Sequence, residues 1–183
     1  ETGTMLRPPH DRRLDMTRVA DAARPEIVLT RLPLIDPADL IALMNDPQVR
    51  RHLPLARGPF GSAECASFVA AKEGLWAEHG YGPWGFMVNG VFAGWGGLQP
   101  EGDDVDLGLV LRPAYWGLGR VLAARFVAIA FEALRAESVV VLLPPSRVRV
   151  SGIGRLGFRR DGALDVAGTR FHRYRLWAPA ASR

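Results

Sequence analysis

One stretch of the sequence constrains the fold more than any other: a strand, a helix and a second strand follow one another between residues 104 and 143. Residues 104–111 alternate apolar with smaller or polar side chains, the pattern of a strand with one buried face. A helix is expected from Gly117 to about Arg135, and Ser138–Leu143 is an uninterrupted apolar run typical of a buried strand. Two strands joined by a helix in one sheet should lie parallel, with the helix in a right-handed crossover.

Antiparallel elements are expected on both sides of this unit. Asn89-Gly90, the strongest short hairpin signal, joins the strand patterns Pro83–Val88 and Val91–Leu98. Asp36-Pro37 supplies a helix cap followed by proline at the first helical position. The other expected elements, in chain order, are a strand over Glu26–Leu32, helices over Pro37–Asn45, 46–52 and Ser62–His79 with Ser62 as its cap, a short helix over 148–156, and strands over 158–161 and 169–176. An antiparallel meander followed by a strand–helix–strand unit predicts an α+β (mixed α/β) fold.

The length of 183 residues fits one compact domain, which we place at residues 25–178. Residues 1–24 are polar and aperiodic, so we expect a disordered tail that includes a cloning tag, and residues 179–183 form a short second tail.

No window approaches the roughly 18 to 20 uninterrupted apolar residues of a membrane span. The single cysteine, Cys65, excludes an internal disulfide and lies in an apolar-periodic stretch, where a buried small hydrophobic residue is expected. There is no apolar signal-peptide core between Met5 and Met16, so we expect a cytoplasmic protein.

The formal charge of +4 suits an anionic partner such as a nucleotide cofactor, a nucleic acid or a membrane surface. Arginine accounts for all but one of the basic residues, and Lys72 is the only lysine. Many arginines lie in the first 24 residues, so the expected domain is less basic than the whole chain. Coding bias is the alternative explanation for the missing lysines.

The segment 109–123 carries the clearest sign of a binding site. A strand pattern ends at Pro113, and a helix is expected to begin among Gly117 and Gly119. Backbone N–H groups in the first turn of a helix lack internal partners, and glycine lets a bulky anion approach them, so this arrangement predicts a phosphate cradle. Arg120 supports it, because a cation in the first turn costs about 0.3 to 1 kcal/mol unless an anion is bound. A plain tight turn with a solvated Arg120 is the alternative.

Three separated motifs resemble those of the GCN5-related N-acetyltransferase (GNAT) family. The run Asp106-Leu107-Gly108-Leu109-Val110-Leu111-Arg112-Pro113-Ala114-Tyr115-Trp116-Gly117-Leu118-Gly119 is similar to the acetyl-CoA signature of its ribosomal-protein N-acetyltransferase (RimJ/RimL-like) branch. Residues 45–49 are similar to the turn between the first helices of that branch, and residues 155–159 to the family's Lys-Leu-Gly-Phe element. The resemblance covers about residues 26–177, in the family's order and spacing.

The resemblance implies a GNAT-type acyl-CoA N-acyltransferase fold, with a central, mostly antiparallel, twisted sheet of about six to seven strands flanked by helices. It implies a bacterial acyltransferase that moves an acetyl group from acetyl-CoA to a primary amine by direct attack in a ternary complex. The amine could belong to a protein N-terminus, a lysine or a small molecule, and no metal ion is expected. A membrane or nucleic-acid partner is not expected, and a homodimer is an open alternative to a monomer.

The resemblance also assigns the cofactor and the chemistry to named residues. The pantetheine arm would pair with the strand edge, and the pyrophosphate would lie on the helix start. These two groups are Leu109, Val110 and Leu111 on the strand, and Trp116, Gly117, Leu118, Gly119, Arg120, Val121 and Leu122 at the helix start. Asp106 falls where the family often keeps an acidic residue near the acceptor amine, and as a candidate base it could take a proton directly or through a water. The alternative for Asp106 is a solvated strand residue.

The sequence departs from the family pattern at several positions. Val121 stands where small residues are usual and narrows the room beside the phosphates. Arg147 holds the place of an asparagine that normally helps to fix the cofactor, and it could reach a phosphate instead. No tyrosine lies within 148–156, where many relatives keep a general acid for the departing thiolate, so Tyr174 is the remaining candidate acid. These departures leave open a non-catalytic acyl-CoA-binding or regulatory module, and nucleic-acid binding through the arginines is a third hypothesis.

The aromatic residues before and around the proposed site admit two interpretations. They are Trp76, Tyr81, Trp84, Phe86, Trp95 and Trp116. Aromatic residues on strands and helices usually belong to a core, and some of these could instead floor an acceptor pocket. The histidines His52, His79 and His172 have no metal-ligand spacing.

Overall fold

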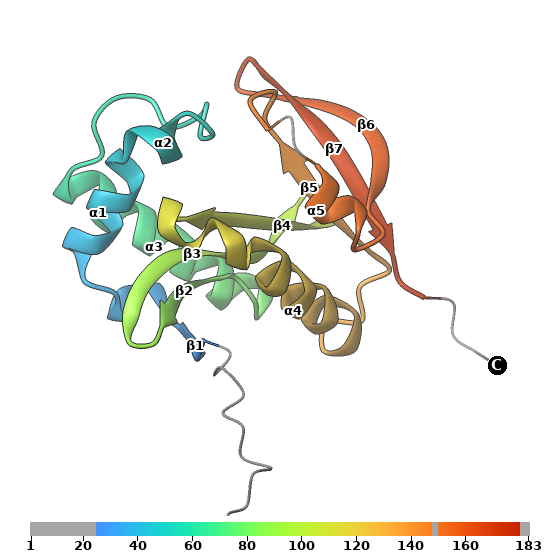
Figure 1. Cartoon of the computed structure of the whole chain (residues 1–183), viewed down its shortest axis with the longest axis horizontal. Coiled ribbons are helices and arrows are strands. Elements are labelled where there is room, and N and C mark those ends of the chain that lie inside the picture. The colour runs from blue at the N-terminus through green and yellow to red at the C-terminus, as the bar shows by residue number, and fades with distance from the viewer. Residues whose placement is uncertain (1–24, 148–149, 180–183) are drawn as a thin grey trace, which may run out of the picture.

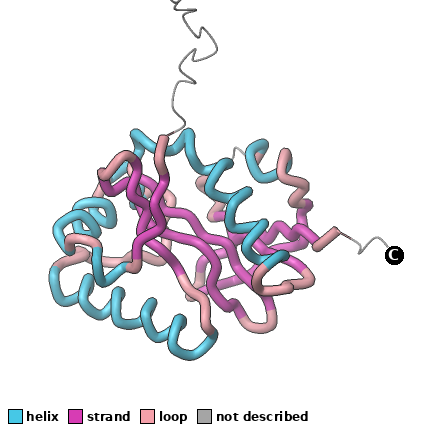
Figure 2. Tube along the Cα trace, turned by 90° about the horizontal axis from the view of Figure 1, so that it is seen from below, coloured by secondary structure: helices cyan, strands magenta, loops and turns pink. Residues whose placement is uncertain are grey.

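A computed structural model describes residues 25–147 and 150–179 of the chain. Within these residues a seven-stranded sheet crosses the molecule, with helices on both of its faces (Figures 1 and 2). In chain order the elements are β1 (Ile27–Thr30), the 3₁₀ helix η1 (Leu32–Leu34), α1 (Pro37–Asn45), α2 (Pro47–Arg50), α3 (Ser62–His79), β2 (Pro83–Val88), β3 (Val91–Glu101), β4 (Asp104–Leu111), the 3₁₀ helix η2 (Pro113–Leu118), α4 (Gly119–Glu132), β5 (Ser138–Leu143), α5 (Ser151–Gly154), β6 (Arg159–Val166) and β7 (Thr169–Trp177).

The strand order is β1-β2-β3-β4-β5-β7-β6. All neighbouring strands are antiparallel except β4 and β5, which are parallel and are joined through α4. The predicted mixed α+β fold, its mostly antiparallel sheet and its one parallel crossover are therefore confirmed. Asn89 and Gly90 both adopt positive φ, at 49° and 79°, as the predicted hairpin turn requires.

On one edge, β4 is tightly closed against β3. The two strands pair continuously from Gly94 opposite Leu111 to Glu101 opposite Asp104. Gly96 has φ 150°, and a Cβ at this position would collide with the carbonyl oxygen of Gly108 on β4. Glycine is thus required here by the close approach of the two backbones.

On its other edge, β4 leaves β5 after two positions. Val105 lies opposite Val139 and Asp106 opposite Val140, and no further register pair joins the two strands. β5 continues alongside β7 over its whole length, from Ser138 to Leu143. The sheet therefore splits into a V, with the second half of β4 on one arm and the end of β5 on the other.

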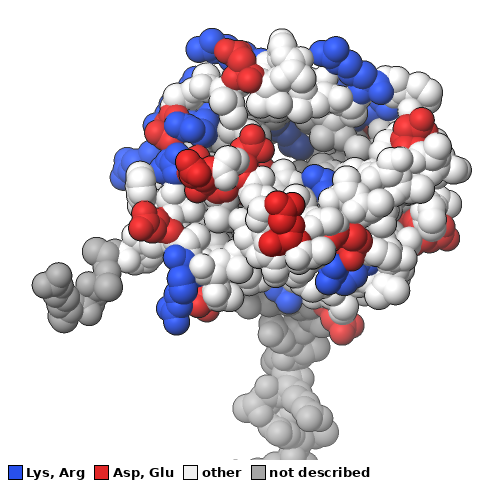
Figure 3. Space-filling view, turned by 180° about the vertical axis from the view of Figure 1, so that it is seen from behind, with Lys and Arg blue, Asp and Glu red and all other residues white. Residues whose placement is uncertain are grey.

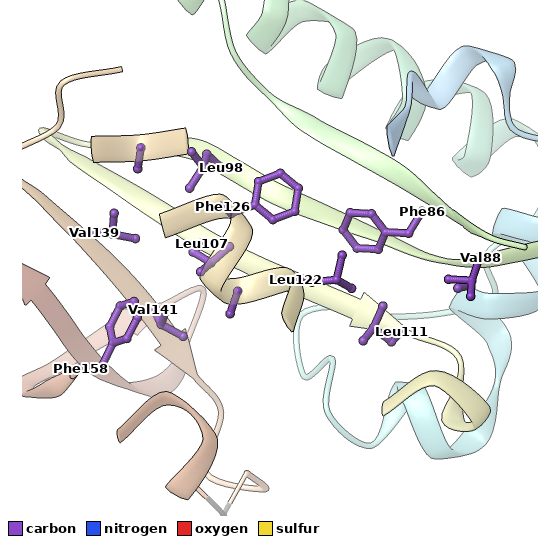
Figure 4. Packing of buried hydrophobic residues seen from close by; sticks show 13 residues of the cluster. Phe86, Val88, Leu98, Leu107, Leu111, Leu122, Phe126, Val139, Val141 and Phe158 are labelled. Atoms are coloured by element: carbon purple, nitrogen blue, oxygen red, sulfur yellow. The ribbon is translucent and has the colours of Figure 1, made fainter. Parts of the chain in front are cut away.

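The two faces of the sheet are covered by different helices. α4 packs Leu122 and Phe126 against Leu98 and Leu107, and the same cluster extends to Val139 on β5 (Figure 4). α1 and α3 cover the opposite face, where Leu40, Leu43, Cys65, Phe92 and Val110 belong to a second cluster. Cys65 is buried at 2% exposure, as predicted. The alternation predicted for β4 is confirmed, because Leu107 faces α4 and Val110 faces the other side.

Several predicted boundaries differ from the structure for local reasons. The first strand ends at Thr30 rather than Leu32, because Pro33 lacks the N–H that a strand ladder needs and lies instead in η1. The cap of α3 is Gly61, whose N–H donates to Oε2 of Glu64, so Ser62 is the first helical residue.

Other differences lie in the second half of the chain. α4 begins at Gly119 rather than Gly117, because Pro113 opens the 3₁₀ helix η2, which includes Gly117. The last hairpin is longer than predicted, since its turn lies at Ala167-Gly168 and β6 runs to Val166. The helix predicted for 148–156 is described only at Ser151–Gly154, and residues 148 and 149 lie outside the described residues. The tail predicted at 1–24, and residues 180–183 of the tail predicted at 179–183, also lie outside them.

The segment Pro113–Glu132 is long and apolar enough to cross a membrane, by length and composition alone. Arg120 and Arg125 interrupt it. One of its faces is packed on the sheet through Leu122 and Phe126.

Candidate active site

A cavity of about 660 Å³ occupies the V between β4 and β5. Its wall comes from both faces of the sheet, since Ala123 of α4 and Phe68 of α3 both line it. The described wall residues are Met44, Val49, His52, Leu53, Pro54, Leu55, Ala56, Phe68, Lys72, Trp95, Leu107, Gly108, Leu109, Val110, Leu111, Trp116, Gly119, Arg120, Ala123, Val141, Leu142, Leu143, Pro144, Arg147, Val150, Gly152, Ile153, Leu156 and Phe171. The cavity therefore passes through the sheet, from an α4 end at Gly119 to an α3 end at Phe68.

The surroundings of the V agree with this course. In Figure 1 the first helices lie on one side of β4, and the β6–β7 hairpin rises on the other. Figure 3 shows a hollow in the surface of the molecule with basic side chains in and beside it.

The α4 end combines open space with positive charge. Gly119 has an ordinary helical φ of −54°, and a Cβ placed on it would meet no atom within 4 Å. The fold itself thus has no need of glycine at 119, whereas a bound group in the cavity would have. Arg120 and Arg147 both line this end, and burial lowers the pKa of the Arg147 guanidinium. The guanidinium carbon of Arg147 lies 5.5 Å from the ring centre of Trp116, a cation–π contact that orients it.

The predicted cofactor residues divide into two groups. Those on the cavity wall are Leu109, Val110, Leu111, Trp116, Gly119, Arg120 and Arg147. Those off the wall are Gly117, Leu118, Val121 and Leu122. Val121 is 55% exposed, and the side chain of Leu122 is in the core.

The predicted phosphate cradle has fewer free backbone N–H groups than the sequence suggested. η2 runs directly into α4, and Leu118 between them has helical φ and ψ. The N–H of Gly119 consequently donates to the carbonyl of Trp116 and is not free for an anion. At this end the side chains of Arg120 and Arg147 are the wall groups that carry full positive charge.

A polar contact joins the wall residue His52 to Ser146, a distant part of the chain. Nδ1 of His52 lies 3.0 Å from Oγ of Ser146, and the His52 ring meets Trp116 edge-on at 6.0 Å. Burial, together with the charges of Arg147 and Arg51, lowers the pKa of His52. This shift favours the neutral form of the imidazole.

The α3 end is mostly apolar but holds one cation, Lys72. Its Nζ donates to Oε1 of Gln99 at 2.8 Å and lies 5.5 Å from the ring centre of Trp95. Burial lowers the pKa of the Lys72 ammonium, while the charges of Asp106 and Glu101 oppose this shift. The chain's only lysine thus holds its ammonium group in one place on the wall.

Asp106 stands at the last position where β4 and β5 are paired, opposite Val140. It is 6% exposed, so the alternative of a solvated strand residue is wrong. Oδ2 accepts from Nε2 of Gln99 at 3.1 Å, and Oδ1 is buried without a hydrogen bond to a described residue. Burial raises the pKa of Asp106 to about 6; the Gln99 amide, the approaching N–H of Leu142 and Lys72 only partly oppose this, and Glu101 adds to it.

Gln99 connects the buried carboxylate to the cavity. Its side chain accepts from Lys72 on the wall and donates to Asp106 behind it. Asp106 itself is not a wall residue, so its role as a base stays a prediction that needs a short proton path to the cavity.

Tyr174, the candidate acid, lies between β5 and β6 rather than on the cavity wall. It pairs with Val141 and with Arg160, whose guanidinium carbon is 5.8 Å from the tyrosine ring centre. Its role stays a prediction, and the structure gives it no contact with the cavity.

The aromatic residues divide between the two predicted interpretations. Trp76 and Trp84 stack edge to face at 4.7 Å away from the cavity, and Phe86 is fully buried in the core. Trp95 and Trp116 line the cavity, and the buried Nε1 of Trp95 has no partner among the described residues.

Sequence reasoning missed Lys72, Gln99, His52 and Phe171 as site residues. The sequence shows that Lys72 is the only lysine, but its place in the site depends on a hydrogen bond to Gln99 that only the tertiary fold creates. In residues 25–147 and 150–179, no three His, Cys, Asp or Glu side chains are grouped so that they could hold a metal ion.

The cavity can hold an elongated molecule with an anionic part at the α4 end, and a second, apolar molecule can meet it from the α3 end.

A family model described as an acetyltransferase (GNAT) domain matches residues 26–158. The chain therefore belongs to the GNAT acetyltransferase family.

Solved structures of this fold cover most of the chain. An acetyltransferase from Agrobacterium tumefaciens is 21% identical with a TM-score of 0.68, over 85% of this chain and 94% of that one. A GNAT-family acetyltransferase from Bacillus anthracis is 15% identical with a TM-score of 0.63, over 84% and 96%. A spermidine N-acetyltransferase from Vibrio cholerae, in complex with CoA and spermine, is 17% identical with a TM-score of 0.60, over 82% and 95%. At these identities the likeness shows the fold.

Proposed function

We propose that the chain transfers an acetyl group from acetyl-CoA to a primary amine by direct attack within a ternary complex. The observation that carries this proposal is the cavity through the sheet, because it joins a basic end to an apolar end without a barrier between them. We also place the chain in the ribosomal-protein N-acetyltransferase branch, on the motifs in residues 106–119, and in the cytoplasm.

The donor fits the α4 end. The phosphates of acetyl-CoA would meet Arg120 and Arg147 beside Gly119, where a Cβ is absent and space is open. The pantetheine arm would follow the unpaired edge of β4 from Leu111 toward Leu109. A protein of the same fold has been solved with CoA and spermine bound, which supports a CoA donor and an amine acceptor for this chain.

The acceptor would enter from the α3 end and meet the thioester where the sheet opens. The amine nitrogen forms a bond to the acetyl carbonyl carbon, the carbon–sulfur bond breaks, and sulfur leaves as the CoA thiolate. The nitrogen loses a proton, and Asp106 is the candidate base because its carboxylate is ionised above pH 6 and lies one residue from the wall residue Leu107.

A non-catalytic acyl-CoA-binding module is the second candidate function. The observation that favours it is the position of Tyr174, which is off the cavity wall. The two functions share the donor site and differ in turnover, so one pair of measurements separates them.

Calorimetric titration with acetyl-CoA tests the donor site. We expect micromolar binding by the wild type and its loss in Gly119→Trp, whose indole would fill the α4 end. Gly74→Trp is the matched control, because Gly74 is also helical with open space around it but lies off the wall. Absence of binding by the wild type would overturn both candidate functions.

Release of the CoA thiol in the presence of amines then tests turnover. Acceptor-dependent release that disappears in Gly119→Trp would support the transferase. Tight binding of acetyl-CoA without release for any amine class would support the binding module instead.

A further inference from the structure

We infer that the acceptor is an apolar primary amine that also carries a carboxylate, and that Lys72 selects it over polyamines. This inference deepens the proposed function and rests on it.

The wall has no counter-charge for a second ammonium group. Among the described wall residues there is no aspartate or glutamate, and the charged ones are Lys72, Arg120 and Arg147. Asp106, whose carboxylate is hydrogen-bonded to Gln99, is buried and is not a wall residue. An acceptor with two ammonium groups would therefore place one of them, partly desolvated, in a cavity of like charge.

The two arginines and the lysine serve different parts of the cavity. Arg120 and Arg147 lie at the α4 end, where the donor phosphates would neutralise them. Lys72 comes from α3, on the opposite face of the sheet, between Phe68 and Trp95. The charges of Asp106 and Glu101 act on the Lys72 ammonium, but it forms no salt bridge with a carboxylate of a described residue, so it can bind a carboxylate of the acceptor directly.

Lys72 retains the means to bind an anion. An ammonium group has three N–H donors, and among the described residues one of them is used, by Oε1 of Gln99 at 2.8 Å. That bond, and the ring centres of Phe68 and Trp95 at 5.8 and 5.5 Å, fix the position of Nζ. A fixed, partly buried cation forms a stronger hydrogen bond with a carboxylate than a solvated one does.

The surroundings of Lys72 suit a hydrocarbon or aromatic body. Met44 and Val49 contribute from the first helices, Phe68 and Trp95 from α3 and β3, and Phe171 from the last hairpin. Phe68 and Trp95 lie beside the Lys72 ammonium, and the other three add apolar surface to the same cavity, so an acceptor with an apolar body and one carboxylate satisfies both.

Three ring compounds test the inference with one amine and one changing group. They are 4-(aminomethyl)benzoate, 4-methylbenzylamine and 4-(aminomethyl)benzylamine, which carry a carboxylate, a methyl group and a second amine. The 3-substituted isomers are run beside them to vary the distance to Lys72. Calorimetry on the CoA-loaded protein measures binding, and thiol release from acetyl-CoA measures kcat/KM.

We expect the wild type to prefer the carboxylate compound over the methyl compound by at least tenfold in both readouts, and the diamine to be the weakest. Lys72→Met, with similar length and no charge, should remove the preference, and Lys72→Glu should turn it toward the diamine. Arg51→Met is the matched control: Arg51 is exposed and near the cavity but not on its wall, so the preference should stay within twofold.

Equal or diamine-favouring binding by the wild type, or a preference unchanged in Lys72→Met, would overturn the inference. So would the failure of all three compounds to bind. These outcomes concern the acceptor alone, whereas loss of the proposed function would appear as absent acetyl-CoA binding or absent thiol release. Intact mass confirms that Lys72 stays unacetylated, because its acetylation would imitate Lys72→Met.

Discussion

The two edges of β4 differ in how far they are paired with the neighbouring strand. Toward β3 the strand pairs without a break from Asp104 to Leu111, and glycines on β3 permit backbones to approach more closely than any side chain would allow. Toward β5 it pairs at Val105 and Asp106 only. On the β3 edge, glycine lets two backbones come into close contact. On the β5 edge the strands part, and Gly119, without a side chain, leaves the resulting cavity open. A glycine's position in this chain therefore indicates a function only when its surroundings are known.

The largest expected effect lies on the closed edge. Gly96→Ala should lower the free energy of unfolding by about 3 to 5 kcal/mol, because the added Cβ collides with Gly108 and the φ of 150° disfavours alanine. Chemical denaturation with urea measures the loss. Gly74→Ala, in the helix α3 with open space around it, is the control and should not destabilise. A loss under 1 kcal/mol for Gly96→Ala would mean that the two strands can separate without cost.

The next largest effect is expected at Asp106, the last residue of β4 that is paired with β5. Its folded pKa of about 6 exceeds the ordinary aspartate pKa of 3.8, so the folded state holds its proton to a higher pH than the unfolded chain does. Stability contributed by this group falls as pH rises from about 4 to 6, and the cost above pH 6 is about 3 kcal/mol. Asp106→Asn should thus raise the unfolding free energy by roughly 1 to 3 kcal/mol at pH 8 and leave it unchanged at pH 3.

The same variant tests catalysis. As a base, Asp106 acts when ionised, so kcat/KM should rise with pH through about 6 in the wild type. In Asp106→Asn this limb should disappear and the rate should fall by about 10²-fold. A stabilised variant with full activity would make the carboxylate structurally costly and chemically idle.

A smaller effect is expected on the open edge at Arg147. Arg147→Met should weaken acetyl-CoA binding about tenfold, which is about 1.4 kcal/mol, and make binding less sensitive to salt. Calorimetry at two ionic strengths measures both. Arg159→Met, on an exposed residue outside the cavity wall, is the control and should change neither.

The smallest effect provides the sharpest contrast with Gly96. Gly119→Ala should raise the unfolding free energy by about 0.5 to 1 kcal/mol, because alanine is the better helix residue and its Cβ meets no atom. It should weaken acetyl-CoA binding by about threefold, since the methyl group enters the cavity. The same substitution would then have opposite effects on stability at the two edges, and a destabilised Gly119→Ala would remove that contrast.

The parts of the fold that were predictable are those set by neighbours in sequence. Asp36 and Pro37 start α1 where expected, with the Asp36 side chain accepting from the N–H of Ala38 at 2.9 Å. The hairpin at Asn89-Gly90 and the alternation along β4 follow from local geometry in the same way. The parallel pairing of β4 with β5 follows from the helix that joins them, without any side-chain detail.

The site was predictable in outline and not in detail. The residues on the unpaired edge of β4 were named, but where β4 and β5 part depends on how β5 follows β7, far along the chain. The use of the Gly119 N–H by Trp116 depends on η2, which local propensity did not indicate. Lys72 meets Gln99 across 27 positions of sequence, and no periodic signal reports such a contact.

The parting of β4 from β5 creates an edge strand in the middle of a sheet. Free strand edges invite pairing with other chains and are a common route to aggregation, so proteins usually shorten, charge or cover them. Here the free edge lies within the wall of a cavity, flanked by η2 on one side and the chain after β5 on the other. The protein can thus keep a row of backbone groups available to a small extended ligand while denying it to another protein's strand. Its solubility and its capacity to bind would then depend on the same sheltered geometry.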